Sequence, residues 1–229
     1  MIIGGLQRSS LIDYPGRIAA VVFLRGCNFR CPYCFNPELV DPARYSDPIP
    51  EEELFALLNR RVGKLDGVVI TGGEPTINPD LLSFIKRIKE LGYLVKLDTN
   101  GSRPDLIQTA IEEDLIDYIA LDLKAPFDKY HLAAGITVDI GAIRTTIELL
   151  TRSGIDHEFR TTVLPDLITE SDLIAIGGII KGARRWAIQN FQPTKVLDPS
   201  YQNRSPYTEA ELERFKEKLK GYVLEIEIR

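Results

Sequence analysis

Residues 17–34, RIAAVVFLRGCNFRCPYC, join an apolar segment directly to a loop that holds every cysteine of the chain. The apolar part is partly β-branched and too short for a typical helix, so we expect a buried strand. The loop carries Cys27, Cys31 and Cys34 in the spacing C-x3-C-x2-C. Thiolates gathered so closely repel one another unless a cation binds them, and the loop therefore predicts a metal centre.

The number of cysteines limits the kind of metal centre. Three cysteines cannot complete a tetrahedral zinc site without a fourth ligand, and the only histidines, His131 and His157, lie far away in the sequence. A [4Fe-4S] cluster with three cysteine ligands fits better, because one iron then stays available to a small molecule. An odd number of cysteines in one loop also suits a reducing compartment rather than a secreted disulfide framework.

Length and composition restrict the class of protein. The chain has 229 residues, of which 44% are hydrophobic, and a net charge of -5. This length suits one domain with a substantial core. The charge shows no basic excess, so we do not expect a nucleic-acid partner. No apolar run approaches the roughly 20 residues that cross a bilayer, and no signal peptide is evident, so we expect no membrane association and a cytoplasmic location.

The rest of the chain alternates between strand-like and helix-like segments. We expect strands at 17–24, 67–71, 93–97, 118–123, 159–164 and 186–191, and helices at 49–62, 79–91, 104–114, 139–153 and 171–181. The residues before 17 read as an extended lead-in or a hairpin arm. An amphipathic helix at 208–220 and a strand-like segment at 222–228 end the sequence.

Six strands that are mostly followed by helices indicate parallel βαβ units, because parallel neighbours need a crossover of a dozen or more residues. We expect an α/β fold, specifically a partial (β/α)6 barrel of the TIM type. A doubly wound open sheet is the alternative, since periodicity cannot distinguish an open sheet from a closing one. The prediction is one domain over 1–229, with a core at about 17–200 and a C-terminal helix and strand at 207–229.

Polar and glycine residues gather where the predicted strands end. Active sites of α/β barrels lie at the carboxyl ends of the strands, so we expect these segments to converge on one face. After the cysteine loop they are Gly72-Gly73-Glu74, Asp98-Thr99-Asn100-Gly101, Asp122 with Lys124, Arg160 within the fifth strand and Gln192 after the sixth.

The C-x3-C-x2-C loop, with aromatic Tyr33 before its last cysteine and Gly72-Gly73-Glu74-Pro75 one strand later, resembles the radical S-adenosylmethionine (SAM) superfamily. More narrowly, several segments resemble the activating enzymes of glycyl-radical proteins, above all those of anaerobic ribonucleoside-triphosphate reductase and of pyruvate formate-lyase. The resemblance covers most of residues 1–200. Those segments are LIDYPG at 11–16, FLRGC at 23–27, NPEL at 36–39, DTNG at 98–101 and DLK at 122–124.

This resemblance implies that Cys27, Cys31 and Cys34 hold a [4Fe-4S] cluster whose free iron chelates the amino and carboxylate groups of SAM. An electron from the cluster would then cleave SAM to methionine and a 5'-deoxyadenosyl radical. Gly72 and Gly73 would let the backbone approach the methionine moiety, because glycine has no Cβ. The carboxylate of Glu74 would pair with the SAM ammonium group.

The same resemblance assigns further cofactor contacts. Asp98 and Asp122 would help to bind a monovalent cation beside the SAM carboxylate, and Lys124 and Arg160 would contact its ribose or carboxylate. For Asp98 an Asx turn or helix cap is the structural alternative. For Lys124 and Arg160 it is an ordinary ion pair. Tyr33, Asn100 and Gln192 complete the residues that we expect around SAM.

Two departures leave the substrate open. Phe35 follows the last cysteine where many activating enzymes have histidine, and Pro193-Thr194-Lys195 also lacks a histidine found in pyruvate formate-lyase activase. The leading hypothesis is an activating enzyme with a glycyl-radical enzyme as protein substrate and a low-potential electron donor such as flavodoxin or ferredoxin. A radical SAM enzyme for a small molecule or nucleoside is the second hypothesis, and a non-catalytic metal-binding module is the third.

Overall fold

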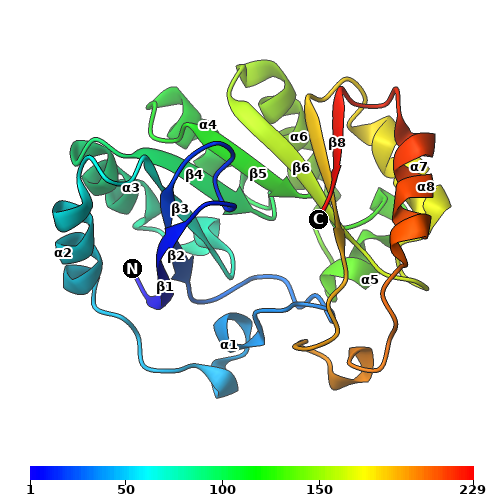
Figure 1. The fold of residues 1–229 in the computed structure, drawn as a ribbon, viewed down its shortest axis with the longest axis horizontal. Coiled ribbons are helices and arrows are strands. Elements are labelled where there is room, and N and C mark those ends of the chain that lie inside the picture. The colour runs from blue at the N-terminus through cyan, green and yellow to red at the C-terminus, as the bar shows by residue number, and fades with distance from the viewer.

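The computed structural model describes residues 1–229 and contains one eight-stranded sheet whose strands lie side by side in chain order (Figure 1). Strands β2 to β8 are parallel, and β1 pairs antiparallel with β2. The strands are β1 (Ile3–Ser10), β2 (Ala19–Leu24), β3 (Gly67–Gly72), β4 (Leu94–Thr99), β5 (Tyr118–Asp122), β6 (Asp156–Val163), β7 (Arg185–Asn190) and β8 (Glu225–Ile228).

The sheet curves into a barrel that stays open between β1 and β8, which are its two edges (Figure 1). Helices cover the outside of the curve, so the expected partial barrel is confirmed and the doubly wound sheet, which has helices on both faces, is excluded. The helices are α1 (Pro37–Val40), α2 (Glu51–Arg61), α3 (Leu81–Glu90), α4 (Pro104–Glu112), α5 (Tyr130–Ala134), α6 (Ile140–Ser153), α7 (Glu170–Ile179) and α8 (Glu209–Leu219).

The two faces of the sheet differ in chemistry because side chains alternate along a strand. On β4, Val95 and Leu97 belong to the main hydrophobic core between sheet and helices, whereas Lys96 and Asp98 form a buried ion pair on the other face. A small second cluster that includes Tyr14 and Tyr118 fills the interior near the amino ends of the strands. The carboxyl half of the interior is therefore left to polar side chains.

The predicted elements all occur, with boundary shifts of a few residues. The hairpin-arm alternative for the N-terminus is right: Ile3–Ser10 forms β1, although its sequence IGGLQRSS lacks a clear strand pattern. The short helices α1 and α5 were not expected, because each spans about one turn and cannot show a period. No helix is both long enough and apolar enough to span a membrane.

Candidate active site

The cysteine loop follows β2 and is held in place by backbone hydrogen bonds from distant segments. The Gly26 N–H donates to the Leu39 carbonyl at 2.7 Å, and the Arg30 N–H donates to the Ala134 carbonyl at the end of α5 at 2.8 Å. Gly135 ends α5 with a φ of 68°, and a Cβ there would lie 2.0 Å from the Arg30 carbonyl oxygen. Helices α1 and α5, which the sequence did not reveal, thus fix the loop.

Cys27, Cys31 and Cys34 line one open cavity at the carboxyl ends of the strands. All three are free thiols. Burial, with a contribution from the Glu74 carboxylate, raises the pKa of Cys27 to about 12, and burial raises the pKa of Cys31 to about 11. Neutral thiols become metal ligands only when a metal displaces the proton, so these cysteines need a strongly binding centre.

The donor set fits an iron–sulfur cluster, because three cysteine thiolates can each bind a different iron of a [4Fe-4S] cluster. No group of three or more His, Cys, Asp and Glu side chains is arranged to hold a single metal ion. The hydroxyl of Tyr33 is buried beside the same cavity and has no hydrogen-bond partner in the chain.

Gly72 and Gly73 lie where β3 meets the segment leading into the cysteine loop. Gly72 has a φ of 114°, and a Cβ on Gly73 would lie 1.8 Å from the Gly26 carbonyl oxygen. The Gly73 and Glu74 N–H groups donate to the Leu24 and Gly26 carbonyls at 2.8 and 2.7 Å. Both glycines line the cavity. They are required first by this packing of the chain against itself, whatever ligand their backbone also meets.

Glu74 is 1% exposed, and its carboxylate ties β3 to β4. Oxygen Oε1 accepts from the Thr76 N–H, the Thr76 hydroxyl and the Thr99 hydroxyl at 3.0, 2.6 and 2.8 Å. Oxygen Oε2 accepts from the Asn100 N–H alone, at 2.6 Å, and so keeps capacity for another donor. Burial raises the pKa of Glu74 in spite of these hydrogen bonds.

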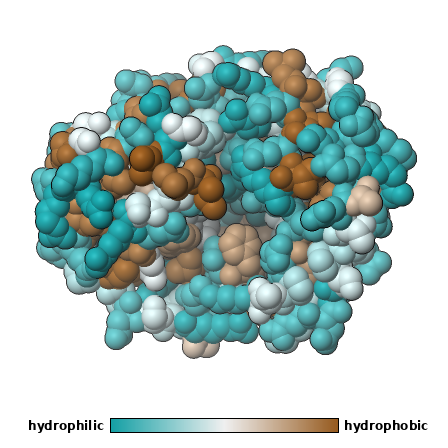
Figure 2. All heavy atoms as spheres, in the orientation of Figure 1, coloured by the Kyte–Doolittle hydropathy of each residue, from teal (hydrophilic) through white to brown (hydrophobic).

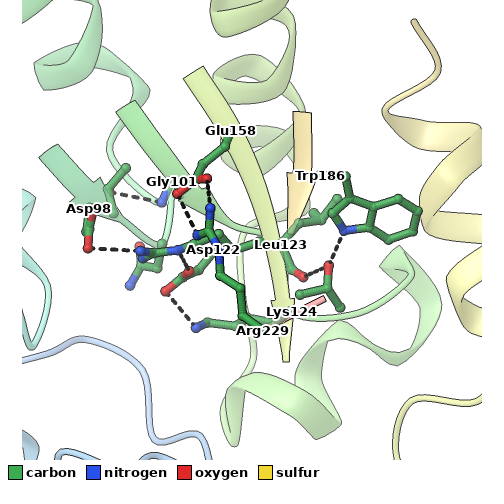
Figure 3. A network of polar contacts seen from close by, with 12 residues as sticks. Asp98, Gly101, Asp122, Leu123, Lys124, Glu158, Trp186 and Arg229 are labelled. Atoms are coloured by element: carbon green, nitrogen blue, oxygen red, sulfur yellow. Dashed lines mark hydrogen bonds and ion pairs between the residues drawn. The ribbon is translucent and has the colours of Figure 1, made fainter. Parts of the chain in front are cut away.

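A buried ion-pair network fills the interior beside the cavity (Figure 3). Arg160 on β6 bridges two carboxylates, with Nε 2.7 Å from Asp122 Oδ1 and Nη1 2.9 Å from Asp98 Oδ2. Lys96 Nζ lies 2.6 Å from Asp98 Oδ1, and Lys124 Nζ lies 3.1 Å from Asp122 Oδ2. Burial alone would raise the pKa of Asp98 and Asp122, but the neighbouring cations outweigh it: they lower the pKa of Asp98 and hold that of Asp122 well below its usual range.

The turn after β4 uses other side chains than Asp98, for which an Asx turn was the structural alternative. Thr99 Oγ1 accepts from the Gly101 N–H at 3.1 Å, and Asn100 Oδ1 accepts from the Ser102 N–H at 3.0 Å. The Asn100 amide also donates to Asn28 in the cysteine loop at 2.9 Å. Asp98 is thereby left to the ion-pair network, and Asn100 connects the β4 turn to the cysteine loop.

Gln192 is the one predicted site residue that the structure removes from the cavity. It lies in the loop beyond β7 and is exposed, whereas Gln189 on β7 lines the cavity. Thr162 also lines it, and its Cα pairs with that of Gln189 in the sheet register. Alternation from Arg160 would have pointed to Thr162, two residues on. The other expected residues all line the cavity: Tyr33, Gly72, Gly73, Glu74, Asp98, Asn100, Asp122, Lys124 and Arg160.

Figure 2 shows the face of Figure 1 as space-filling atoms, mostly hydrophilic and hollowed near its middle, between the side of β1 and the side of β8. Phe35, which stands in the place of the usual histidine, lines the cavity and is 57% exposed. An exposed aromatic ring at the edge of a cavity is available to a substrate rather than committed to the core.

Comparisons with known proteins agree with this arrangement. The model of the radical SAM superfamily matches residues 21–175. A Methanocaldococcus jannaschii protein with the provisional name glycyl-radical enzyme activating enzyme is 35% identical over 100% of this chain and 95% of its own length. The pyruvate formate-lyase-activating enzyme of Clostridium pasteurianum is 33% identical over 53% of this chain and 52% of its own.

Solved structures share the fold at low sequence identity. The crystal structure of Streptococcus suis SuiB bound to S-adenosylmethionine has a TM-score of 0.66 and 16% identity, over 91% of this chain and 51% of that one. The cysteine loop and the glycine-rich end of β3 line one cavity, and both lie within residues 21–175, which the superfamily model matches. The chain therefore belongs to the radical SAM superfamily and is a radical SAM enzyme rather than a non-catalytic metal-binding module.

Proposed function

We propose that this enzyme generates a glycyl radical on a partner protein, and that the partner is an anaerobic ribonucleoside-triphosphate reductase. The observation that carries the proposal is the convergence of the three cysteines with the ends of β3, β4 and β5 on one open cavity. The full-length relative at 35% identity, whose provisional name is that of a glycyl-radical enzyme activating enzyme, supports the same reaction.

In this proposal Cys27, Cys31 and Cys34 hold a [4Fe-4S] cluster and leave one iron for the amino and carboxylate groups of SAM. When bound, the cluster passes an electron from a low-potential donor such as flavodoxin or ferredoxin to SAM, which splits into methionine and a 5'-deoxyadenosyl radical. The cysteine loop keeps the cluster at the inner end of the cavity, since Cys31 is buried and Cys27 and Cys34 are half-buried.

The remaining residues bind and orient SAM. Gly72 and Gly73 present their backbone to the methionine moiety, and the Oε2 atom of Glu74 accepts from its ammonium group. Lys124 and Arg160 face the carboxylate or ribose. Asp98 and Asp122 hold these two cations in position, as the ion pairs of 2.7 to 3.1 Å support.

Three more side chains complete the proposed SAM site. Tyr33 contacts SAM from the cysteine loop, and Asn100 contacts it from the β4 turn. Gln189 takes the place that the sequence assigned to Gln192.

The partner enters on the open side of the barrel. The gap between β1 and β8 admits a glycine-bearing loop of the partner. Phe35 is exposed at the cavity and offers an apolar contact to that loop.

The cluster is tested by anaerobic reconstitution, with iron and sulfide analysis and detection of 5'-deoxyadenosine after SAM and reductant are added. Wild type is expected to bind iron and form the product, and Cys31→Ala to lose both. His131→Ala is the matched control and is expected to keep both the iron and the product. A site that used this histidine as a ligand would lose metal in the variant. No product from reconstituted wild type would contradict the proposal.

The partner is tested by incubating the active enzyme with anaerobic ribonucleoside-triphosphate reductase and recording electron paramagnetic resonance spectra. We expect a glycyl-radical signal that disappears when the target glycine of the reductase is replaced by alanine. SAM cleavage without this signal would favour the second hypothesis, in which the substrate is a small molecule or nucleoside.

A further inference from the structure

Lys96 is a buried charge that lies beside the proposed SAM site without lining its cavity. It is 2% exposed, and its Nζ lies 2.6 Å from Asp98 Oδ1. A lysine is almost never fully buried unless its charge is paired, and Lys96 is paired with a residue that does line the cavity. Its charge therefore acts on the site through Asp98.

All four carboxylate oxygens of Asp98 and Asp122 already have a cationic partner within the chain. Asp98 receives Lys96 on one oxygen and Arg160 on the other, at 2.6 and 2.9 Å. Asp122 receives Arg160 and Lys124, at 2.7 and 3.1 Å. A monovalent cation bound by these aspartates would need at least one of those oxygens, and it would stand next to a protein cation that repels it.

The sheet register shows that this pairing is built into the strands. Asp98 is paired across β4 and β5 with Ala120, and Asp122 is paired across β5 and β6 with Arg160. The small side chain of Ala120 leaves room for the guanidinium of Arg160 to reach from the row of Asp122 to the row of Asp98. Lys96 and Asp98 are two residues apart on β4 and so face the same side of the sheet.

The charge balance of the cluster points the same way. Lys96, Lys124 and Arg160 carry three positive charges against the two of the opposite sign on Asp98 and Asp122, which leaves one positive charge for an anionic ligand group. Burial would lower the pKa of Lys124 and Arg160, but the aspartates outweigh it and keep both pKa values well above their ordinary values. Lys124 and Arg160 therefore stay charged beside the aspartates at neutral pH.

We propose that Lys96 takes the place of the monovalent cation that resemblance to pyruvate formate-lyase activase suggests, so that this enzyme binds SAM without one. Lys96 is a positioning residue. Its ammonium group neutralises the Asp98 carboxylate from the side away from the cavity, and this leaves Arg160 oriented toward the cavity. The inference rests on the proposed function only in naming SAM as the ligand. The residues themselves do not fit a cation site, whichever substrate the enzyme acts on.

The test compares KCl, NaCl and choline chloride at one ionic strength, so that screening is the same in all three. SAM affinity is measured by calorimetry on the reconstituted protein without reductant, and the midpoint of thermal unfolding on the protein without SAM. For wild type we expect SAM dissociation constants within about twofold of one another and equal midpoints, because the proposal has no cation bound in any of the three salts. Choline is the reference, because its cation is too large for the site. A tenfold gain in affinity, or a higher midpoint, in KCl or NaCl would overturn the proposal.

Lys96→Ala removes the ammonium group and opens space beside Asp98. We expect its SAM affinity in choline chloride to fall about tenfold or more and to recover in part in KCl or NaCl, with a matching rise in the unfolding midpoint. Lys96→Met/Asp98→Asn removes both charges and should show no cation effect. Affinity of Lys96→Ala equal to wild type in choline chloride would contradict the role of Lys96.

Lys89→Ala is the matched control, because Lys89 also pairs with an aspartate, Asp117, at 2.9 Å but outside the cavity. It should lose a little stability equally in the three salts. The unfolding measurement needs neither SAM cleavage nor a partner protein, so a failure of the proposed function and a failure of this inference are distinguishable. If Lys89→Ala responds to KCl or NaCl as strongly as Lys96→Ala, the effect follows from breaking any lysine–aspartate pair. That result would overturn the proposal.

Discussion

Gly73 shows at the scale of one residue why the end of β3 needs glycine. A methyl group at this position would lie 1.8 Å from the Gly26 carbonyl oxygen, 2.6 Å from its carbon and 3.3 Å from the Cys27 nitrogen. These atoms belong to the backbone that begins the cysteine loop, so they cannot move without moving the loop. The packing of β3 against this loop and the position of the cysteines are therefore one structural feature.

We expect Gly73→Ala to lower the free energy of unfolding by about 1–3 kcal/mol, the usual cost of forcing an extra methyl into a packed site. Urea unfolding of the metal-free protein measures this. Gly178→Ala in α7 is the control, because a Cβ there would meet no other part of the chain within 4 Å, and it should gain about 0.5–1 kcal/mol from the better helix former. Equal stability of Gly73→Ala and wild type would contradict the close packing.

Glu74→Gln tests a second residue of the same segment. The amide nitrogen of glutamine cannot accept a hydrogen bond, so the change leaves at least one buried donor without a partner among Thr76, Thr99 and Asn100. We expect a loss of about 1–3 kcal/mol in the free energy of unfolding. Thr76→Val, which removes one of these donors, is a milder comparison, and a neutral Glu74→Gln would show that the carboxylate does not hold β3 to β4.

Among the elements, β8 positions a charge that reaches past its neighbouring strand. β8 pairs with β7, and Arg229, the residue directly after β8, donates to Glu158 on β6 at 3.2 and 2.8 Å (Figure 3). Glu158 is 1% exposed. The open edge of the barrel thus carries the counter-charge of a carboxylate inside it.

Arg229→Met is expected to destabilise the fold by roughly 3 kcal/mol, because it leaves the Glu158 carboxylate buried and unpaired. Glu158→Gln/Arg229→Met should recover most of the loss, since the double variant buries no unpaired charge. Thermal and urea unfolding of the two variants give the comparison. If the double variant is no more stable than Arg229→Met, the pair is not what holds this edge of the barrel.

For the whole molecule, the interior ion-pair network makes the free energy of unfolding depend on pH. The pKa values of Asp98 and Asp122 are lower in the folded chain than the usual unfolded value of about 3.9. Folding therefore gains stability from these ionised groups above pH of about 4 and loses it as the pH falls further. The cause is the pairing with Arg160, Lys96 and Lys124, which outweighs burial.

We expect the free energy of unfolding to fall steeply between about pH 5 and pH 2, measured by urea unfolding at a series of pH values. Asp98→Asn/Asp122→Asn should be less stable at pH 7 but should show a shallower slope in this range, because two titrating groups are gone. An unchanged slope would mean that other carboxylates cause the acid sensitivity.

Much of the fold could be predicted from the sequence because it depends on short-range patterns. Apolar β-branched runs such as Val68-Val69-Ile70 specify strands, and the spacing of Leu81, Ile85 and Ile88 specifies a helix, since each pattern is set by the geometry of one element. β1 could not be assigned from its own residues, because IGGLQRSS becomes a strand only by pairing with β2. The one-turn helices α1 and α5 are too short for any period to appear.

The residue types and their places after successive strands can be read from the chain alone, and the family resemblance suggests a metal and SAM site there. Which of these side chains meet depends on the curvature of the folded sheet. Gln189 rather than Gln192 reaches the cavity because the inward face of β7 ends there, and Arg160 joins two aspartates 62 and 38 positions away. Lys96 gained a role only when the curved sheet buried it against Asp98, since buried charges interact through distance and dielectric, which sequence separation does not encode.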